Sequence, residues 1–234
     1  SHWFQPLTGA TAEKHDSFIS APKSDGKILM EFSGKELIKG EPDASSFPSG
    51  GLRATCAARG YTAWDVGSPA YVKDGILCIP TAFCSYTGES LDTKTPLLKA
   101  CDAVSKAGVR FVKMFGNTDA KRVSSYVGPE QEYFIVNREK YLERPDLIYA
   151  GRTLFGAPAP KGQEMEDQYF GPLKTKIADF MADVDEQLWK LGITVKTQHN
   201  EVAPGQHEIA PIFAPADAAL DSNFLVMDVL KSTA

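Results

Sequence analysis

The segment 199–211, HNEVAPGQHEIAP, constrains the fold most strongly because it places a glutamate on either side of a turn. Proline followed by glycine, here Pro204 and Gly205, is typical of the central positions of a β-turn. If the flanking strands pair around this dipeptide, Glu201 faces Glu208 in an antiparallel hairpin. Like charges directly opposite each other destabilise such a ladder. This register therefore predicts a cation between the two carboxylates.

The same segment allows a second interpretation. Type II turns, which favour proline followed by glycine, fit two-residue hairpin loops poorly. The loop could then be longer and the register of the two strands different. His199 and His207 flank the two glutamates and could act as ligands, as general bases or as hydrogen-bonding neighbours. The residues alone leave these alternatives open.

A second pair of glutamates lies in the segment 128–136, GPEQEYFIV. On a strand Glu130 and Glu132 point to one face, and Tyr133 and Ile135 to the other. A solvated strand face would also produce this pattern, but the apolar flanks favour a buried strand. Two carboxylates on one buried face need a cation or protons.

Four glutamates on two such elements would form an all-oxygen site. Hard oxygen ligands suit Mg²⁺ or Mn²⁺ better than zinc. Sites of this kind commonly serve phosphoryl transfer, where the cations neutralise the phosphates of a nucleotide. The sequence contains neither the GxGxxG nor the P-loop pattern, so a nucleotide site of either class is not expected.

The rest of the chain predicts an α+β fold with helices packed on a largely antiparallel sheet. Residues 1–92 favour short strands and long loops, with a buried strand at 76–80. After residue 92 the pattern is more regular. It predicts a helix of about 12 residues from Thr95 to the stop at Gly108, strands at 110–115, 132–136 and 193–197, a helix at 172–191 capped by Gly192, and a last helix from Asp217.

Composition excludes several classes of protein. The net charge of −5 argues against nucleic acid or an anionic membrane as a partner. No apolar run approaches the roughly 18 residues of a membrane helix, and the first residues lack a signal-peptide core. The four cysteines, Cys56, Cys78, Cys84 and Cys101, form no CxxC pair. They indicate reduced, mostly buried thiols in a cytoplasmic protein.

At these motifs the chain resembles glutamine synthetase. GPEQEYF resembles the GxExEFF strand of that family, and HNEVAPGQHEI resembles its second acidic motif. PDASS, at 42–46, resembles the DGSS motif of the N-terminal β-grasp domain. The opening HWFQPLTGATAEKHDSF and the segment 151–171, GRTLFGAPAPKGQEMEDQYFG, resemble the long type III branch.

The resemblance implies two domains and a reaction. A β-grasp-like domain would occupy residues 1–92, and part of the catalytic domain, with an antiparallel half-barrel sheet, would occupy 93–234. The reaction would join ammonia to L-glutamate with ATP, through γ-glutamyl phosphate, and release glutamine, ADP and phosphate. Two or more Mg²⁺ or Mn²⁺ ions would act in each site. The protein would form a ring-type homo-oligomer with active sites between subunits.

The resemblance also assigns the metal ligands. Glu132, Glu201 and Glu208 match the ligands of the first metal, which steadies the substrate glutamate and the developing phosphoryl transfer. Glu130 matches a ligand of the second metal, which lies against the phosphates of ATP.

Two further residues carry over with roles in substrate binding. Asp43 matches the aspartate that binds and deprotonates ammonium in the active site of a neighbouring subunit. Phe213 matches an aromatic residue that packs against the adenine. Ala44, Gln168 and Lys196 depart from the pattern of the family.

The later motifs of the family are not among these 234 residues. They include the NGSG-type loop, the arginines for substrate and phosphates, and the last metal glutamate. The chain is therefore expected to be a fragment of a longer enzyme or a truncated, non-catalytic relative. A glutamate–amine ligase that uses another amine is the remaining alternative.

Overall fold

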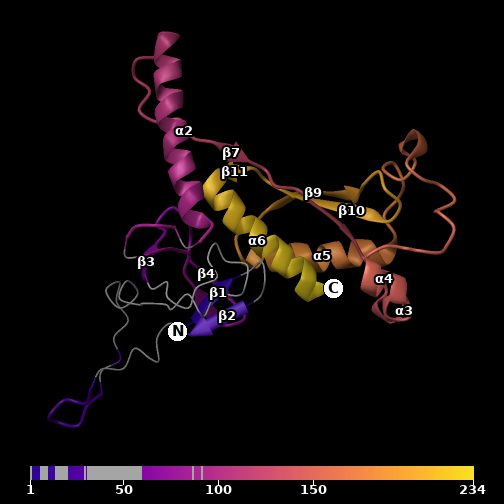
Figure 1. Cartoon of the computed structure of the whole chain (residues 1–234), viewed down its shortest axis with the longest axis horizontal. Helices are drawn as coiled ribbons and strands as arrows, with labels where there is room; N and C mark the ends of the chain where they lie inside the picture. The colour runs from indigo at the N-terminus through magenta and orange to yellow at the C-terminus, as the bar shows by residue number, and fades with distance from the viewer. Residues whose placement is uncertain are drawn as a thin grey trace. The chain divides into compact units, whose positions relative to one another are not determined.

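The computed structural model describes residues 2–5, 10–13, 21–28, 30, 60–85, 87–90 and 92–234 (Figure 1). Asp43, Cys56 and the PDASS motif lie outside these residues. The helices are α2 (Lys94–Met114), α3 (Arg138–Leu142), α4 (Pro145–Ala150), α5 (Thr175–Lys190) and α6 (Ala216–Thr233), with a 3-10 turn at Glu164–Glu166. The strands are β1 (His2–Gln5), β2 (Ala10–Glu13), β3 (Gly60–Trp64), β4 (Tyr71–Lys73), β5 (Ile76–Cys78), β6 (Thr81–Ser85), β7 (Tyr126–Val127), β8 (Gln131–Phe134), β9 (Val195–Asn200), β10 (Gln206–Pro211) and β11 (Ala214–Pro215).

All strand pairs in the described part of the chain are antiparallel, which confirms the predicted α+β class. The pairs are β1–β2, β3–β6, β4–β5 and β7–β11, and a three-stranded sheet has the order β8-β10-β9. The chain forms two compact units, one of residues 1–127 and 214–228 and the other of 128–213 and 229–234. The predicted domain boundary after residue 92 stays a prediction.

Helix α5 supplies the apolar core of the second unit. The predicted helix at 172–191 is confirmed, although it starts three residues later, at Thr175. Met181, Val184 and Leu188 of its apolar stripe are buried, as helical periodicity requires for one face. Figure 1 shows α5 running along β9 and β10.

The end of α5 is set by glycine. Gly192 adopts a φ of 78°, a left-handed conformation that other residues adopt at a cost. The N–H of Gly192 donates to the carbonyl of Trp189 at 3.0 Å, and that of Ile193 donates to Leu188 at 2.9 Å. This pair of bonds is a Schellman motif. It turns the chain so that the buried Ile193 leads into β9.

Helix α2 differs from the prediction. A helix ending at Gly108 and a strand at 110–115 were both expected, but one helix of 21 residues spans Lys94–Met114. Gly108 is a packing position inside it, because an added Cβ would lie 3.0 Å from the side chain of Val123. The strand prediction was wrong because the apolar residues at 111, 112, 114 and 115 also fit one helical face.

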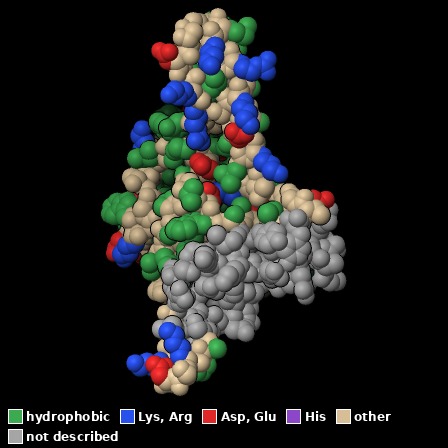
Figure 2. Space-filling view, turned by 90° about the vertical axis from the view of Figure 1, so that its left-hand side faces the viewer, with side chains coloured by type: hydrophobic (Ala, Val, Ile, Leu, Met, Phe, Trp, Pro, Cys, Tyr) green, Lys and Arg blue, Asp and Glu red, His purple; other side chains and the backbone are tan. Residues whose placement is uncertain are grey.

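The C-terminal half of α2 is exposed. Phe111, Met114 and Phe115 are 61%, 82% and 76% exposed, respectively. Figure 2 shows lysine and arginine side chains gathered over the same part of the helix. None of the described helices is long and apolar enough to cross a membrane.

Two predictions about burial were also wrong. Strand β5 is confirmed, but Ile76 and Leu77 are 64% and 53% exposed. Among the described strands β5 pairs only with β4, and the described residues leave these two apolar side chains exposed. The cysteines are half-buried where the structure describes them, and Cys78 and Cys101 are free thiols.

A buried ionic group joins α2 to α6 in the first unit. The Lys94 ammonium lies 2.9 Å from Asp65 Oδ2 and 2.6 Å from Asp221 Oδ2. Burial alone would raise the pKa of Asp65, but hydrogen bonds from Lys94, Gly67 and Ser68 outweigh it and lower the pKa below 3.8. The ionised carboxylate therefore stabilises the fold above about pH 4, and this contribution is lost as the pH falls through the lowered pKa.

We expect Lys94→Met to lower the free energy of unfolding by about 3 kcal/mol, because it leaves Asp65 buried without its cation. Urea unfolding at pH 7 measures the change. Lys99→Met, an exposed position on the same helix, should change stability by less than about 0.5 kcal/mol. Equal effects of the two substitutions would contradict the proposed role of the buried ionic group.

Candidate metal site

Strand β10 separates two environments by the alternation of its side chains. Ile209 is fully buried and Glu208 is 6% exposed, yet they point to opposite faces. The face of Ile209 packs on α5, since Gln198 Nε2 donates to the carbonyl of Met181 at 3.3 Å. The charged face of Glu208 lies on the other side of the sheet.

The core face of the sheet also carries aromatic groups. Tyr133 on β8 lies opposite His207 on β10. Its ring meets Phe180 of α5 edge-on, with the ring centroids 6.0 Å apart. The two-residue period of β8 therefore places Glu132, the neighbour of Tyr133, on the same face as Glu208.

The register of the hairpin differs from the first interpretation of the sequence. Glu208 lies opposite His199 and not opposite Glu201. The register is shifted by two residues relative to that interpretation. Such a shift keeps every side chain on its original face, so Glu201 still lies on the face of Glu208.

A longer loop causes this shift. The N–H of Glu201 donates to the carbonyl of Gln206 at 2.9 Å, and the N–H of Gln206 donates to Ala203 at 3.1 Å. Gly205 has a φ of 74°, which a type II turn requires at its third position. The Pro-Gly turn thus lies inside a four-residue loop, as the second interpretation of the sequence allowed.

Three side chains converge on the charged face. Ligand atoms of His199, Glu201 and Glu208 all lie within 4.8 Å of one another. The Nε2 atom of His199 is 3.2 Å from Glu208 Oε1, and its Nδ1 atom is 3.7 Å from Glu201 Oε1. The sequence left the role of His199 open, and the structure places it among the glutamates.

The electrostatics of this cluster favour a cation. Burial raises the pKa of Glu208 to about 7, assisted by a hydrogen bond with Glu201 and the negative charge of Glu130, while His199 acts in the opposite direction. Without a cation, Glu208 therefore keeps its proton to a higher pH than an ordinary glutamate does. A divalent ion would replace that proton and relieve the repulsion between the carboxylates.

The remaining two glutamates lie near this cluster. Glu132 on β8 is the direct partner of Glu208 in the sheet. Its Oε2 atom accepts a hydrogen bond of 2.8 Å from Gln206 Nε2, and the group of three does not include it. Glu130, just before β8, and Glu132 are both exposed, so the prediction of a buried carboxylate face on this strand was wrong. The ligand roles of both residues stay predictions.

The other predicted site residues are less informative. Asp43 lies outside the described residues. Phe213 follows β10 with a side chain that is 62% exposed. A Cβ added to Gly128 would lie 3.3 Å from the Cβ of Phe213. Because Gly128 has no side chain, the segment before β8 can pass close to Phe213.

Tyr169 adjoins the cluster although no single motif marked it as a site residue. Its ring lies edge-on to the imidazole of His199, with the centroids 5.1 Å apart. The sequence signal for it was its place in the segment 151–171, shortly before α5.

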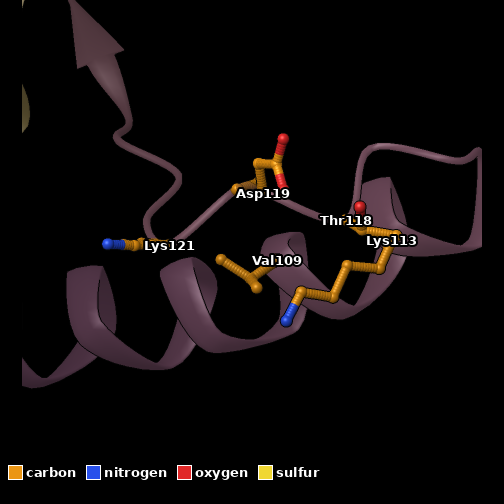
Figure 3. A pocket seen from close by; sticks show the side chains of 6 residues that line it. Val109, Lys113, Thr118, Asp119 and Lys121 are labelled. Atoms are coloured by element: carbon orange, nitrogen blue, oxygen red, sulfur yellow. The ribbon is translucent and has the colours of Figure 1, made fainter.

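One cavity of the structure is lined by none of the predicted site residues. It has a volume of about 710 Å³ and lies between the last turns of α2 and the residues that follow. Its lining is Val109, Lys113, Thr118, Asp119, Ala120 and Lys121. Figure 3 shows the charged ends of Lys113, Asp119 and Lys121 pointing in different directions. They therefore do not form a convergent site.

The chain is similar in sequence to proteins named glutamine synthetase. The chain is 57% identical over 235 aligned residues to the type-3 glutamine synthetase of Dictyostelium discoideum, and 56% identical over 234 residues to a glutamine synthetase of Bacteroides fragilis (strain YCH46). These alignments cover 99% and 100% of the chain. In both cases the chain spans 32% of the length of the relative.

The fold is also similar to that of a solved glutamine synthetase. The cryoEM structure of the Plasmodium falciparum enzyme superposes with a TM-score of 0.54 over 88% of this chain and 42% of that chain, at 20% identity. The family profile for the N-terminal region of type III glutamine synthetase matches residues 1–100, and the profile for the glutamine synthetase catalytic domain matches residues 110–234. On this agreement of profiles, relatives and fold, the chain belongs to the glutamine synthetase family.

Proposed function

We propose that the chain forms part of an enzyme that joins ammonia to L-glutamate with ATP. The observation that carries the proposal is the convergence of Glu201, Glu208 and His199 on one face of an antiparallel sheet, with Glu132 beside Glu208 on that face. The names of the relatives support glutamine synthesis as the overall reaction. Clustered carboxylates of this kind suit Mg²⁺ or Mn²⁺.

Each side chain receives a role in this proposal. Glu132, Glu201 and Glu208 hold the cation that steadies the substrate glutamate, and Glu130 contributes to a second cation at the phosphates of ATP. The bound ions supply charge stabilisation for the phosphoryl group that moves to the γ-carboxylate. Phe213 presents an exposed ring for the adenine.

The assembly completes the site. Asp43 of one subunit would bind and deprotonate ammonium at the glutamate cluster of its neighbour, so that a ring-type homo-oligomer is the active form. We place the protein in the cytoplasm, where free thiols such as Cys78 and Cys101 persist.

Mn²⁺ should raise the thermal midpoint of the chain. At a Mn²⁺ concentration 100-fold above the dissociation constant for Mn²⁺, we expect the thermal midpoint to rise by about 5 to 10 °C, because the ion binds only the folded cluster. Differential scanning fluorimetry with Mn²⁺ or EDTA measures the rise. Glu208→Ala should abolish it. Glu186→Ala, which removes an exposed carboxylate on α5, should leave it intact. If the thermal midpoint of the wild-type chain does not change with Mn²⁺, the proposed metal site is wrong.

The metal-free chain should lose stability as the pH rises. The pKa of Glu208 is raised from 4.5 to about 7 in the fold, so its contribution is fully present below pH 4.5 and is lost as the pH rises through 7. Glu208→Gln removes this titration. We expect the variant to exceed the wild type by about 1 to 2 kcal/mol at pH 8, with no advantage for the variant at pH 4.5.

Urea unfolding in EDTA measures this difference. Glu186→Gln is the matched control, because it makes the same chemical change at an exposed position. A constant difference between Glu208→Gln and the wild type at both pH values would show that Glu208 does not titrate between them.

Activity should require residues from two subunits. In the full-length protein, Asp43→Ala and Glu132→Ala should each lower ATP-dependent glutamine formation at least about 100-fold. When the two inactive proteins are dissociated and reassembled together, some interfaces pair an intact Asp43 with an intact Glu132, and activity should return. Mixtures that stay inactive, despite shown subunit exchange, would place Asp43 at the site of its own chain.

A further inference from the structure

Asn200, at the end of the edge strand β9, joins two segments through its side-chain amide. Its Nδ2 atom donates to the carbonyl oxygens of Gly171 at 2.9 Å and of Pro172 at 3.4 Å. Its Oδ1 atom lies 2.9 Å from Nδ1 of His207 on β10. The amide therefore connects the hairpin to the residues that lead into α5.

The chemistry of the partners sets the orientation of this amide. Main-chain carbonyls only accept hydrogen bonds, so the nitrogen of Asn200 must face Gly171 and Pro172. The oxygen of Asn200 then faces His207, and the Nδ1–H of that imidazole donates to it. His207 is 8% exposed, and the bonds of Asn200 to His207 and Gly171 are partly buried, so their loss carries a cost.

The chain approaches Asn200 closely at a glycine. A Cβ added to Gly171 would lie 3.2 Å from the carbonyl oxygen of Gln168 and 3.7 Å from Asn200 Nδ2. Glycine at position 171 thus permits a tight turn, and the main-chain carbonyl of Gly171 reaches the side-chain amide of Asn200. The N–H of Gly171 closes this turn by donating to Gln168 at 3.2 Å.

The same turn carries Tyr169, which contacts the preceding residue of β9. Successive side chains of a strand point to opposite faces, so Asn200 lies on the core side and His199 on the side of the glutamates. The turn therefore contacts the end of β9 on both faces, through Asn200 on one and through the Tyr169–His199 ring pair on the other.

The imidazole of His199 lies between a main-chain carbonyl and the carboxylate of Glu208. Its Nδ1 atom lies 2.8 Å from the carbonyl oxygen of Asn200, and a carbonyl accepts, so Nδ1 carries a proton. The Nε2 atom then faces Glu208 Oε1 at 3.2 Å. The ring of Tyr169 meets this imidazole edge-on. Contacts of this kind around a metal ligand commonly fix the direction in which the ligand points.

We propose that Asn200 is a positioning residue, which clamps the Gln168–Gly171 turn to β9 and so holds Tyr169 against His199 at the glutamate cluster. The clamp goes beyond the proposed function, and only its effect on cation affinity rests on that function. Asn200 contacts neither substrate nor cation in this proposal. It acts through Tyr169 and His199.

The test replaces the amide by a carboxylate of the same shape. Asn200→Asp still accepts from His207 but cannot donate to Gly171, and its charge faces two carbonyl oxygens. The first readout is the NMR signal of the His199 ring in the metal-free chain, assigned by its loss in His199→Asn. The ring of Tyr169 shifts that signal, so Asn200→Asp should move it toward the position seen in Tyr169→Leu.

The second readout is the affinity for Mn²⁺, measured by electron paramagnetic resonance. We expect Asn200→Asp to weaken binding about tenfold, in the range found for residues that orient metal ligands. Gln198→Glu is the matched control. It makes the same amide-to-carboxylate change on the same face of β9, where Gln198 donates to Met181, and should leave the His199 signal in place.

The outcomes separate the two proposals. An unchanged His199 signal in folded Asn200→Asp overturns the clamp, whatever the Mn²⁺ affinity. A wild-type chain that binds no Mn²⁺ overturns the metal site, while the His199 signal still decides on the clamp. If Asn200→Asp does not fold, Asn200→Ala removes the side-chain hydrogen bonds to Gly171, Pro172 and His207 without adding a charge and is compared in the same way.

Discussion

The candidate site depends on the alternation of side chains along β10. Ile209 and Glu208 are neighbours in the chain. Because side chains alternate along the strand, Ile209 is buried on the face toward α5 and Glu208 lies in the charged cluster on the opposite face. The apolar face anchors the strand to the core and thereby holds the glutamate face rigidly. The free energy gained by burying Ile209 and its apolar neighbours also offsets the cost of keeping Glu208 away from water.

The two units treat buried charge in different ways. Around Lys94, one ammonium forms ion pairs with the carboxylates of both Asp65 and Asp221. Around Glu208, two carboxylates meet a single imidazole, and burial raises the pKa of Glu208 to about 7. The first arrangement stabilises the fold by itself. The second leaves a deficit of positive charge that a divalent ion can fill, which is typical of a functional site.

Periodicity predicted the helices more reliably than local stop signals did. The apolar stripe of α5 extends over several turns and outweighs any single residue, so its position was predicted to within three residues. In α2, Gly108 predicts a stop, but in the structure it makes room for a close contact with Val123. A glycine has the same appearance in the sequence whether it ends a helix or makes room for a neighbour.

The sequence by itself determined which glutamates share a face, because the two-residue period of a strand does not depend on what lies beside it. Glu201 and Glu208 stay on one face even after the register shifts by two residues. The tertiary structure alone decided which side chains meet there. The four-residue loop brought His199 opposite Glu208, β8 paired Glu132 with it, and the turn before α5 added Tyr169. Register and contacts between distant segments depend on loop geometry and packing, which no local pattern of residues specifies.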